Sequence, residues 1–261
     1  MGDRVAVTVQ GGVADVRLTR PDKINALDAA MVEGIVAAGE QVGADPTVRV
    51  VVLSGEGRGF CAGLDFAAFQ GMTEAGDDAV AGLGTIAKLA QRVVRVWAEL
   101  PVPVIAAIHG PALGGGLQLA LGADIRVVAP DARLGALEIR WGIVPDMTGT
   151  QVLPALIGLD HAKELVLTGR TVTGEAAVAI GLATRLGDDP YADALALARE
   201  IATMNPHAVR HAKRLLDLAG TVSLADGLAE ERVAMRELVG SPNQVEAVTA
   251  SFEKRVPSFR D

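Results

Sequence analysis

Two glycine-rich loops carry the first sign of chemistry. The sequence RGFCAGLD ends at Asp65 and GPALGGGLQ ends at Gln118, and each joins an apolar strand-like run to the start of a helix-like run. N–H groups at a helix start have no intrahelical partner, so a bare backbone there can point them at a negative oxygen. Two such loops facing one another would form an oxyanion hole, in which one donor contributes about 3–4 kcal/mol to transition-state stabilisation. Each loop taken alone is better explained by tight strand-to-helix packing.

Two carboxylates follow in the otherwise largely apolar segment RLGALEIRWGIVPDMTGTQ. Glu138 and Asp146 stand among Leu, Ile, Trp and Val, so desolvation should raise the pKa of each carboxyl, which suits proton transfer near neutral pH. The alternative is that Glu138 forms an ion pair with a cation such as Arg133 or Arg140. The residues alone leave both interpretations open.

Three other patterns are weaker candidates for a site. The sequence GLGTIA, residues 82–87, resembles a dinucleotide-binding loop, but it follows an acidic segment rather than a strand. His207 and His211 have metal-ligand spacing, but no third ligand accompanies them and their neighbourhood is cationic. Cys61 has no obvious base nearby. We therefore expect an ordinary helix, a solvated helix face and a buried thiol, and no metal site.

The loops must be positioned by strands and helices of a core. The segments RVAVTVQ and VADVRLT alternate and are joined by Gly-Gly, which predicts a hairpin. Apolar residues recur at helical spacing in RPDKINALDAAMVEGIVAAGEQV, and a second helix is expected near residues 79–100. Continuous apolar runs typical of buried strands occur in VRVVVLSG, PVPVIAAIHG and ADIRVVAP.

The pattern changes near Tyr191. From there the chain consists of four amphipathic segments with almost no strand signal. This predicts an α/β core over residues 1–190 followed by a helical region over residues 191–261.

The composition limits the class of protein. With 261 residues, 50% of them hydrophobic and 21% charged, the chain should be globular. A net charge of −8 disfavours a nucleic-acid partner, because phosphate contacts need clustered Lys and Arg. The absence of an apolar signal region or of about eighteen consecutive apolar residues predicts a cytoplasmic protein with no membrane partner. One cysteine allows neither a disulfide framework nor a cysteine metal cluster.

Taken together, the motifs resemble those of the enoyl-CoA hydratase/isomerase (crotonase) family. The segments that carry the resemblance are RPDKINALD, VVLSGEGRGFCAGLDF, PVPVIAAIHGPALGGGLQLALGADIRVVAPDARLG, EIRWGIVPDMTGTQVLPALIG and the tail SFEKRVPSF. They span most of the chain in the family's order and spacing. The resemblance implies an α/β fold of ββα units wound into a spiral, with C-terminal helices that pack subunits into homotrimers or homohexamers. It also implies an acyl-CoA substrate and no separate cofactor, since coenzyme A enters as part of the substrate.

The resemblance also implies roles for individual residues. The N–H groups of Leu64 and Gly115 would form the oxyanion hole that stabilises an enolate, and Asp65 resembles a residue that caps the following helix. Contacts with the substrate or with coenzyme A are implied for Lys23, Ala62, Gly63, Asp65, Gly114, Lys254 and Phe259. The last two lie in a tail that can reach the ligand of a neighbouring subunit.

The acids depart from the family pattern. Family hydratases carry glutamates at the positions of Gln118 and Glu138, so an amide replaces one acid here. Gln can hold a water or orient a substrate, but it cannot exchange a proton. Losing one acid should therefore cost a large part of the usual 10²–10⁴-fold acid–base contribution. Asp146 stands where hydratases usually have Gly and resembles an acid of the family's dienoyl-CoA isomerases, which also keep an acid at the position of Gln118.

We therefore expect an enzyme that acts on unsaturated acyl-CoA thioesters through an oxyanion-stabilised enolate. Glu138 would be the principal proton carrier, Asp146 a second acid or base, and Gln118 an orienting residue. The replacement at position 118 favours double-bond isomerisation. The alternatives are an enoyl-CoA hydratase that uses Glu138 and Asp146, and a non-catalytic acyl-CoA binding protein. The segment over residues 66–87 is expected to help shape the acyl pocket.

Overall fold

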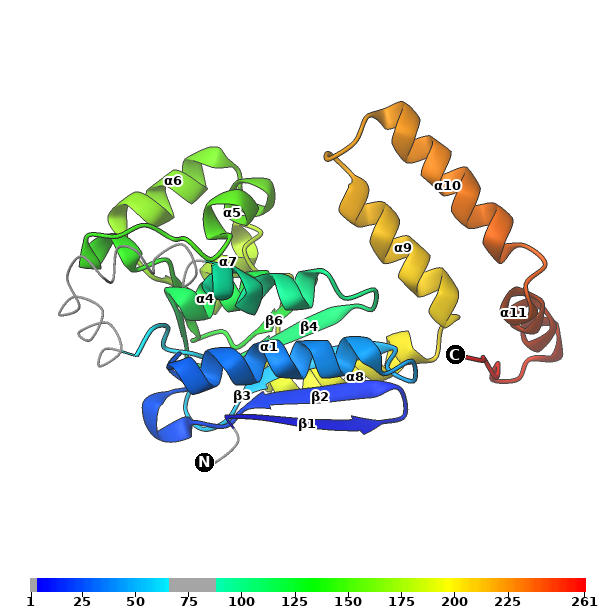
Figure 1. The fold of residues 1–261 in the computed structure, drawn as a ribbon, viewed down its shortest axis with the longest axis horizontal. Coiled ribbons are helices and arrows are strands. Elements are labelled where there is room, and N and C mark those ends of the chain that lie inside the picture. The colour runs from blue at the N-terminus through cyan, green and yellow to red at the C-terminus, as the bar shows by residue number, and fades with distance from the viewer. Residues whose placement is uncertain (1–3, 66–87) are drawn as a thin grey trace.

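The computed structural model describes residues 4–65 and 88–261. Its main sheet has six strands in the order β1-β2-β3-β4-β6-β9, and Figure 1 shows it between helices. The strands are β1 (Val5–Gln10), β2 (Val13–Leu18), β3 (Val50–Gly55), β4 (Val104–Ile108), β6 (Ile125–Val128) and β9 (Arg185–Leu186). The β1–β2 pair is antiparallel, which confirms the predicted hairpin, and the remaining pairs are parallel.

A second, smaller sheet carries the site. It consists of β5 (Pro111–Leu113), β7 (Arg133–Gly135) and β8 (Val172–Thr173), with β5 parallel to β7 and β7 antiparallel to β8. Because β5 follows β4 directly, the chain passes from the main sheet into this small sheet just before the three glycines. Helix α4 (Gly115–Leu121) begins where β5 ends.

The core lies on both faces of the main sheet. Val51 and Leu53 of β3 belong to the larger apolar cluster, which also contains Met31 and Ile35 of α1 (Ala29–Ala44). The intervening Val50 and Val52 belong to a second cluster with α8 (Pro190–Ala202). Both faces of β3 are therefore buried, which explains its continuous apolar sequence.

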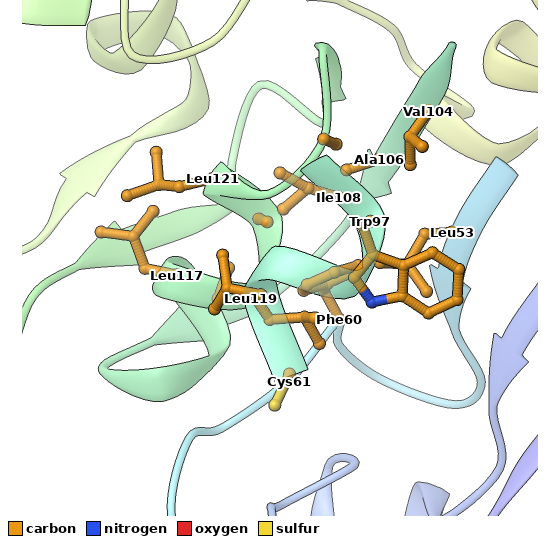
Figure 2. Packing of buried hydrophobic residues seen from close by; sticks show 14 of the residues in the cluster. Leu53, Phe60, Cys61, Trp97, Val104, Ala106, Ile108, Leu117, Leu119 and Leu121 are labelled. Atoms are coloured by element: carbon orange, nitrogen blue, oxygen red, sulfur yellow. The ribbon is translucent and has the colours of Figure 1, made fainter. Parts of the chain in front are cut away.

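Side chains of the larger apolar cluster pack around α4. Figure 2 shows Leu117 and Leu119 of α4 with Phe60, Cys61 and Trp97 in this part of the core. All five are fully buried. Helix α4 is thus anchored in the core by its apolar side chains.

Helix α1 begins later than the sequence suggested. The expected helical segment started at Arg20, but residues Pro21–Lys23 form a short 3-10 turn, and Ile24 and Asn25 have positive φ values of 50° and 54°. The α-helix starts after Asp28, whose side chain accepts a hydrogen bond from the N–H of Met31 at 2.8 Å. An N-cap aspartate of this kind fixes the helix start. The expected helix near residues 79–100 is present over residues 88–98, and its first part lies outside the described residues.

Several short helices follow β7, three of them between β7 and β8 of the small sheet and the fourth between β8 and β9 of the main sheet. They are η2 (Glu138–Trp141), α5 (Gly149–Ile157), α6 (Leu159–Thr168) and α7 (Gly174–Ala179). Glu138 is the first residue of η2, and a loop over residues 142–148 joins η2 to α5. This loop carries Asp146.

The C-terminal region is helical, as predicted. Helix α8 packs on the sheet through Ala194, Ala198 and Ala202. The next three helices, α9 (Pro206–Leu218), α10 (Leu224–Leu238) and α11 (Pro242–Glu253), extend to one side of the core, and we call them the C-terminal arm (Figure 1). The proposed division between residues 190 and 191 stays a prediction. Within residues 4–65 and 88–261, no helix has the length and apolar character needed to cross a membrane.

Candidate active site

The two glycine-rich loops lie side by side. The N–H of Cys61 donates to the carbonyl of Pro111 at 3.0 Å, and the N–H of Leu113 donates to the carbonyl of Cys61 at 3.0 Å. Cys61 also forms a parallel bridge with Ala112. The loop after β3 is therefore held against β5 like an added strand, so that both loops leave the same edge together.

Glycine allows the closest approach of the two loops. Gly63 has φ +89°, and a Cβ atom there would stand 2.5 Å from the carbonyl oxygen of Leu113 and 3.4 Å from the amide nitrogen of Gly115. Gly114 adopts φ 53° and ψ −122°, a combination that side chains disfavour. The structure therefore brings the Gly63–Leu64 and Gly114–Gly115 segments together, as the oxyanion-hole hypothesis requires.

Backbone bonds fix the direction of the Leu64 peptide. The N–H of Leu27 donates to the carbonyl of Gly63 at 2.8 Å, and the N–H of Asp65 donates to the carbonyl of Leu27 at 3.0 Å. Within the part of the chain that the structure describes, the Leu64 N–H itself donates to no backbone carbonyl. The N–H of Gly115 lies in the first turn of α4, where no intrahelical acceptor exists. Both amides predicted to hold an oxyanion are thus available for one.

Gln118 and Glu138 are in direct contact. Nε2 of Gln118 donates to Oε1 of Glu138 at 2.7 Å, and both side chains are buried. Oε1 of Gln118 accepts from the N–H groups of Met147 and Gly149 at 2.9 and 3.0 Å. Glu138 therefore meets an amide rather than a cation, and the ion-pair interpretation with Arg133 or Arg140 is wrong.

The Glu138 carboxyl has the environment of a proton carrier. Burial raises its pKa, hydrogen bonds from its own backbone N–H and from Gln118 lower it, and the negative charge of Asp146 raises it, with an overall upward shift. Within the described residues, Oε2 of Glu138 is buried and has no hydrogen-bond partner. Gly114 is close, since a Cβ atom on it would stand 3.4 Å from Oε1 of Glu138. One carboxylate oxygen is thus committed to Gln118 while the other is free.

Asp146 lies near this carboxyl but in a different environment. Its side chain is exposed rather than enclosed by apolar residues, which differs from the burial expected from the sequence. Two residues later, Thr148 has φ +76°, an uncommon conformation for a β-branched residue. Strained backbone of this kind persists where the surroundings over-determine it. Here the flanking amides of Met147 and Gly149 both converge on Gln118.

Asp65 has a neighbour that the sequence analysis missed. Nη1 of Arg20 lies 2.6 Å from Oδ2 of Asp65 and 3.2 Å from Oδ2 of Asp28, so one guanidinium joins the oxyanion loop to the N-cap of α1. The predicted capping of the next helix by Asp65 falls on residues outside the described ranges. Asn25 acts similarly, because its buried Nδ2 donates to the carbonyls of Glu56, Gly59 and Phe60. In the sequence, the only indication of these two contacts is that a basic residue and an amide residue, Arg20 and Asn25, lie on either side of the turn Pro21–Lys23.

The coenzyme A contacts implied by the family lie in different places. Lys23 is exposed at the end of the 3-10 turn, and the N–H of Ala62 donates to the carbonyl of Ile24 at 2.8 Å, which puts these two close together. Phe259 lies elsewhere, because its carbonyl accepts from Arg49, the residue before β3, at 3.0 Å. The site follows the other end of β3, so the tail does not reach the site of its own chain. Lys254 caps α11 and is exposed.

The weaker candidates from the sequence, the histidine pair and Cys61, have surroundings that explain them without a site. Nε2 of His211 lies 3.2 Å from Oε2 of Glu237 on α10, and Cys61 is fully buried. The GLGTIA segment and the expected acyl-pocket segment, residues 66–87, fall outside the described residues.

Comparison with known proteins identifies the family. The family model for enoyl-CoA hydratase/isomerase matches residues 8–261. The human mitochondrial enoyl-CoA hydratase domain-containing protein 2 is 36% identical over 255 residues, which cover 95% of this chain and 85% of that protein. Human mitochondrial methylglutaconyl-CoA hydratase is 35% identical over 256 residues, covering 95% of this chain and 74% of that protein.

Solved structures agree with this family. A crystal structure of an enoyl-CoA hydratase from Bacillus anthracis has a TM-score of 0.91 and 34% sequence identity, and the match covers 98% of both chains. The observed α/β architecture with C-terminal helices is therefore the crotonase fold. This chain belongs to the enoyl-CoA hydratase/isomerase family of enzymes.

Proposed function

We propose that this enzyme moves a proton along the carbon chain of an unsaturated acyl-CoA thioester, and that double-bond isomerisation is its main reaction. The observation that supports this choice is the bonding of Gln118. Its carbonyl oxygen already accepts two backbone hydrogen bonds, which occupy both lone pairs. Gln118 can therefore hold a water only as a donor, through the second hydrogen of Nε2, and cannot accept a proton from it, whereas isomerisation needs no water.

The reaction requires one base and one oxyanion hole. Oε2 of Glu138 removes a proton from the α-carbon of a 3-enoyl thioester, and the electron pair moves into the thioester carbonyl to give a dienolate. The N–H groups of Leu64 and Gly115 hold the negative oxygen, an effect of about 3–4 kcal/mol per donor in comparable sites. The protonated Glu138 returns its proton to the γ-carbon, which yields the 2-enoyl thioester and regenerates the carboxylate.

The remaining implied residues bind the substrate. Gly63 lets its loop lie against Leu113, where a Cβ atom would stand 2.5 Å from the carbonyl oxygen, and Gly114 adopts a backbone conformation that side chains disfavour; both glycines thus keep the backbone bare beside the two amides. Lys23 and the backbone at Ala62 lie on one side of this loop and suit the nucleotide part of coenzyme A. Asp65 contributes by holding Arg20 and, with it, the loop.

Hydration of a 2-enoyl-CoA is the second candidate. Two observations favour it: the human relative at 35% identity is named a hydratase, and the Asp146 charge acts on the pKa of Glu138. In this reaction Asp146 and Glu138 together hold and deprotonate the water, and Glu138 delivers the proton to the α-carbon.

The assembly is proposed to be a homotrimer or homohexamer. Large apolar side chains on the arm are more than half exposed in the single chain: Leu216, Leu224, Met235, Val239, Val245 and Phe252. Large apolar side chains that are exposed together in one region favour a protein contact there. Packing of subunits through the arm would cover these side chains and bring Lys254 and Phe259 near a neighbouring subunit.

A product profile in deuterated water tests the function. Saturated, 2-enoyl, 3-enoyl and dienoyl thioesters are each incubated with the enzyme and with the Glu138→Gln variant. We expect deuterium at the α-carbon and interconversion of 2- and 3-enoyl thioesters, both lost in the variant. Formation of a 3-hydroxyacyl-CoA as the main product would establish hydration instead. Binding without any exchange would indicate a non-catalytic acyl-CoA binding protein.

A further inference from the structure

We propose that Gln118 is a positioning residue that sets the orientation and charge state of Glu138, rather than a residue that contacts water or substrate. This inference rests on the proposed role of Glu138 as proton carrier. It assigns Gln118 a task that differs from that of the glutamate which family hydratases carry at the same position.

The orientation of the Gln118 amide follows from its partners. The N–H groups of Met147 and Gly149 can only donate, so the atom that they share must be the carbonyl oxygen of Gln118. The NH₂ group then necessarily faces Glu138, to which it donates at 2.7 Å. The Gln118 side chain thus makes three hydrogen bonds to groups held in place by the fold. Another rotamer would lose some of these bonds.

The backbone around Thr148 is shaped for this contact. Thr148 stands at φ +76°, between the two residues whose amides meet at Gln118. Gly149 is also close, because a Cβ atom on it would lie 2.8 Å from Oε1 of Gln118. The loop that carries Asp146 and the helix that carries Gln118 are thus joined at one oxygen atom.

The consequence for Glu138 is a division of labour between its two oxygens. Oε1 accepts the Gln118 hydrogen bond, which fixes the plane of the carboxylate, and the buried Oε2 remains for the substrate. A glutamate at position 118 would instead face Glu138 with a second carboxylate. Two carboxyl groups at this separation share one proton and titrate as a pair. The amide therefore keeps Glu138 as a single carrier with its own ionisation.

Burial, hydrogen bonds and one nearby charge act on the pKa of Glu138 in opposite directions. Burial and the charge of Asp146 raise the pKa of Glu138, whereas the hydrogen bonds from its own backbone N–H and from Gln118 lower it. Asp146 is the only charged side chain with such an effect among the described residues. The other charged or titratable side chains on η2 and on α6, which packs against it, are Arg140, Asp160, His161, Lys163 and Glu164. Removing the Gln118 donor should therefore raise the pKa of Glu138.

The test is a direct titration of Glu138 by ¹³C NMR. Glutamate is labelled at the side-chain carboxyl carbon, and the Glu138 signal is assigned as the one missing from Glu138→Gln. The titration is repeated in Gln118→Met, which has a similar length but donates no hydrogen bond. Gln151→Met is the matched control, because Gln151 is exposed on α5 and its side-chain amide donates to the hydroxyl of the neighbouring Thr150.

We expect the pKa of Glu138 to rise in Gln118→Met and to stay at the wild-type value in Gln151→Met. Exchange of the α-protons of butyryl-CoA with deuterated water should slow by about 10²-fold, because the base is misplaced. The KM for butyryl-CoA should stay within about twofold, since Gln118 does not contact the substrate. The rising limb of the exchange rate against pH should move to higher pH, in step with the NMR titration.

An unchanged Glu138 pKa in a folded Gln118→Met variant would overturn the proposal. Should that variant not fold, Gln118→Glu decides, because it keeps an oxygen for the Met147 and Gly149 amides. In Gln118→Glu we expect two coupled titrations, the higher of which has a pKa above that of Glu138 in the wild type. A Glu138 pKa equal to the wild-type value would contradict the proposal. The NMR result does not depend on turnover. A wild-type protein without α-proton exchange would therefore refute the proposed function and leave the positioning role to be judged by the titration alone.

Discussion

The carbonyl oxygen of Cys61 lies so close to Gly116 that a Cβ atom on Gly116 would stand 2.2 Å from it. The contact joins the first turn of α4 to the loop after β3, which are the two segments that supply the predicted oxyanion donors. Gly116 is therefore required for the approach of the two loops, although its own N–H has no assigned role.

Replacement of Gly116 by alanine should destabilise the protein. Alanine normally stabilises a helix relative to glycine by about 0.5–1 kcal/mol, but here the added carbon meets a backbone carbonyl that cannot yield freely. We expect the free energy of unfolding to fall by about 1–3 kcal/mol, the usual cost of overpacking. Urea unfolding of the variant measures it. Gly227→Ala in α10 is the control, because its nearest neighbour would be 3.9 Å away, and it should gain about 0.5–1 kcal/mol. A Gly116→Ala variant as stable as the wild type would contradict the packing argument.

The raised pKa of Glu138 makes stability depend on pH. A carboxyl with a higher pKa in the folded state stabilises that state while it is protonated, and this contribution is lost as the pH rises through the folded-state pKa. The Glu138→Gln variant has no carboxyl to ionise at this position, so its stability lacks this dependence on pH. The Tm of the variant relative to the wild type should therefore be higher at pH 8 than at pH 4.5, as scanning calorimetry at both pH values would measure. Equal differences at the two pH values would show that Glu138 titrates as in an unfolded chain.

Asp146 should tune Glu138 from a distance. Its negative charge raises the pKa of Glu138, so Asp146→Asn should lower that pKa and move the rising limb of the isomerisation rate to lower pH. The isomerisation rate on its plateau should change by less than about tenfold, whereas hydration, which needs a second carboxylate, should fall by about 10²-fold or more. Rate profiles with 3-enoyl and 2-enoyl thioesters measure both. A plateau isomerisation rate that falls as far as hydration would give Asp146 a direct part in both reactions.

Cys61 should be inert in the folded protein. Burial raises the pKa of its thiol to about 12, and its Sγ donates to the carbonyl of Asn25 at 3.1 Å. Figure 2 shows it among the apolar side chains of the core. At pH 8, labelling by a thiol reagent such as DTNB should be slower than for an exposed cysteine by about 10³-fold, because each pKa unit removes tenfold of the thiolate. In urea one thiol per chain should react, and stoichiometric labelling without denaturant would refute the prediction.

The close approach of the two glycine-rich loops was predictable, because runs of glycine mark a bare backbone in the sequence. Gly63, Gly114 and Gly115 could be assigned from the residues and the family resemblance. The separate packing role of Gly116 could not be, since it depends on the position of Cys61 in a loop more than fifty residues earlier in the sequence.

The start of α1 and the partners of Gln118 could not be predicted from the sequence. The start of α1 was misplaced because apolar spacing continues through Arg20–Asn25, where two residues with positive φ interrupt the helix. The partners of Gln118 were hidden for a related reason. Backbone amides leave no mark in a sequence, and the amides of Met147 and Gly149 meet Gln118 only after the chain folds.

A buried amine of the C-terminal arm contacts the chain at the start of β4. Nζ of Lys213 on α9 donates to Oδ2 of Asp124 at 2.7 Å and to the carbonyl of Val102 at 3.1 Å, while the same Oδ2 accepts from the N–H of Val104 at 2.7 Å. Val104 is the first residue of β4, the strand that leads through β5 to the three glycines. Undocking of α9 removes the lysine that holds this carboxylate in place. The solvent-exchange rate of a single amide proton, that of Val104, therefore reports from inside the sheet how often the arm detaches.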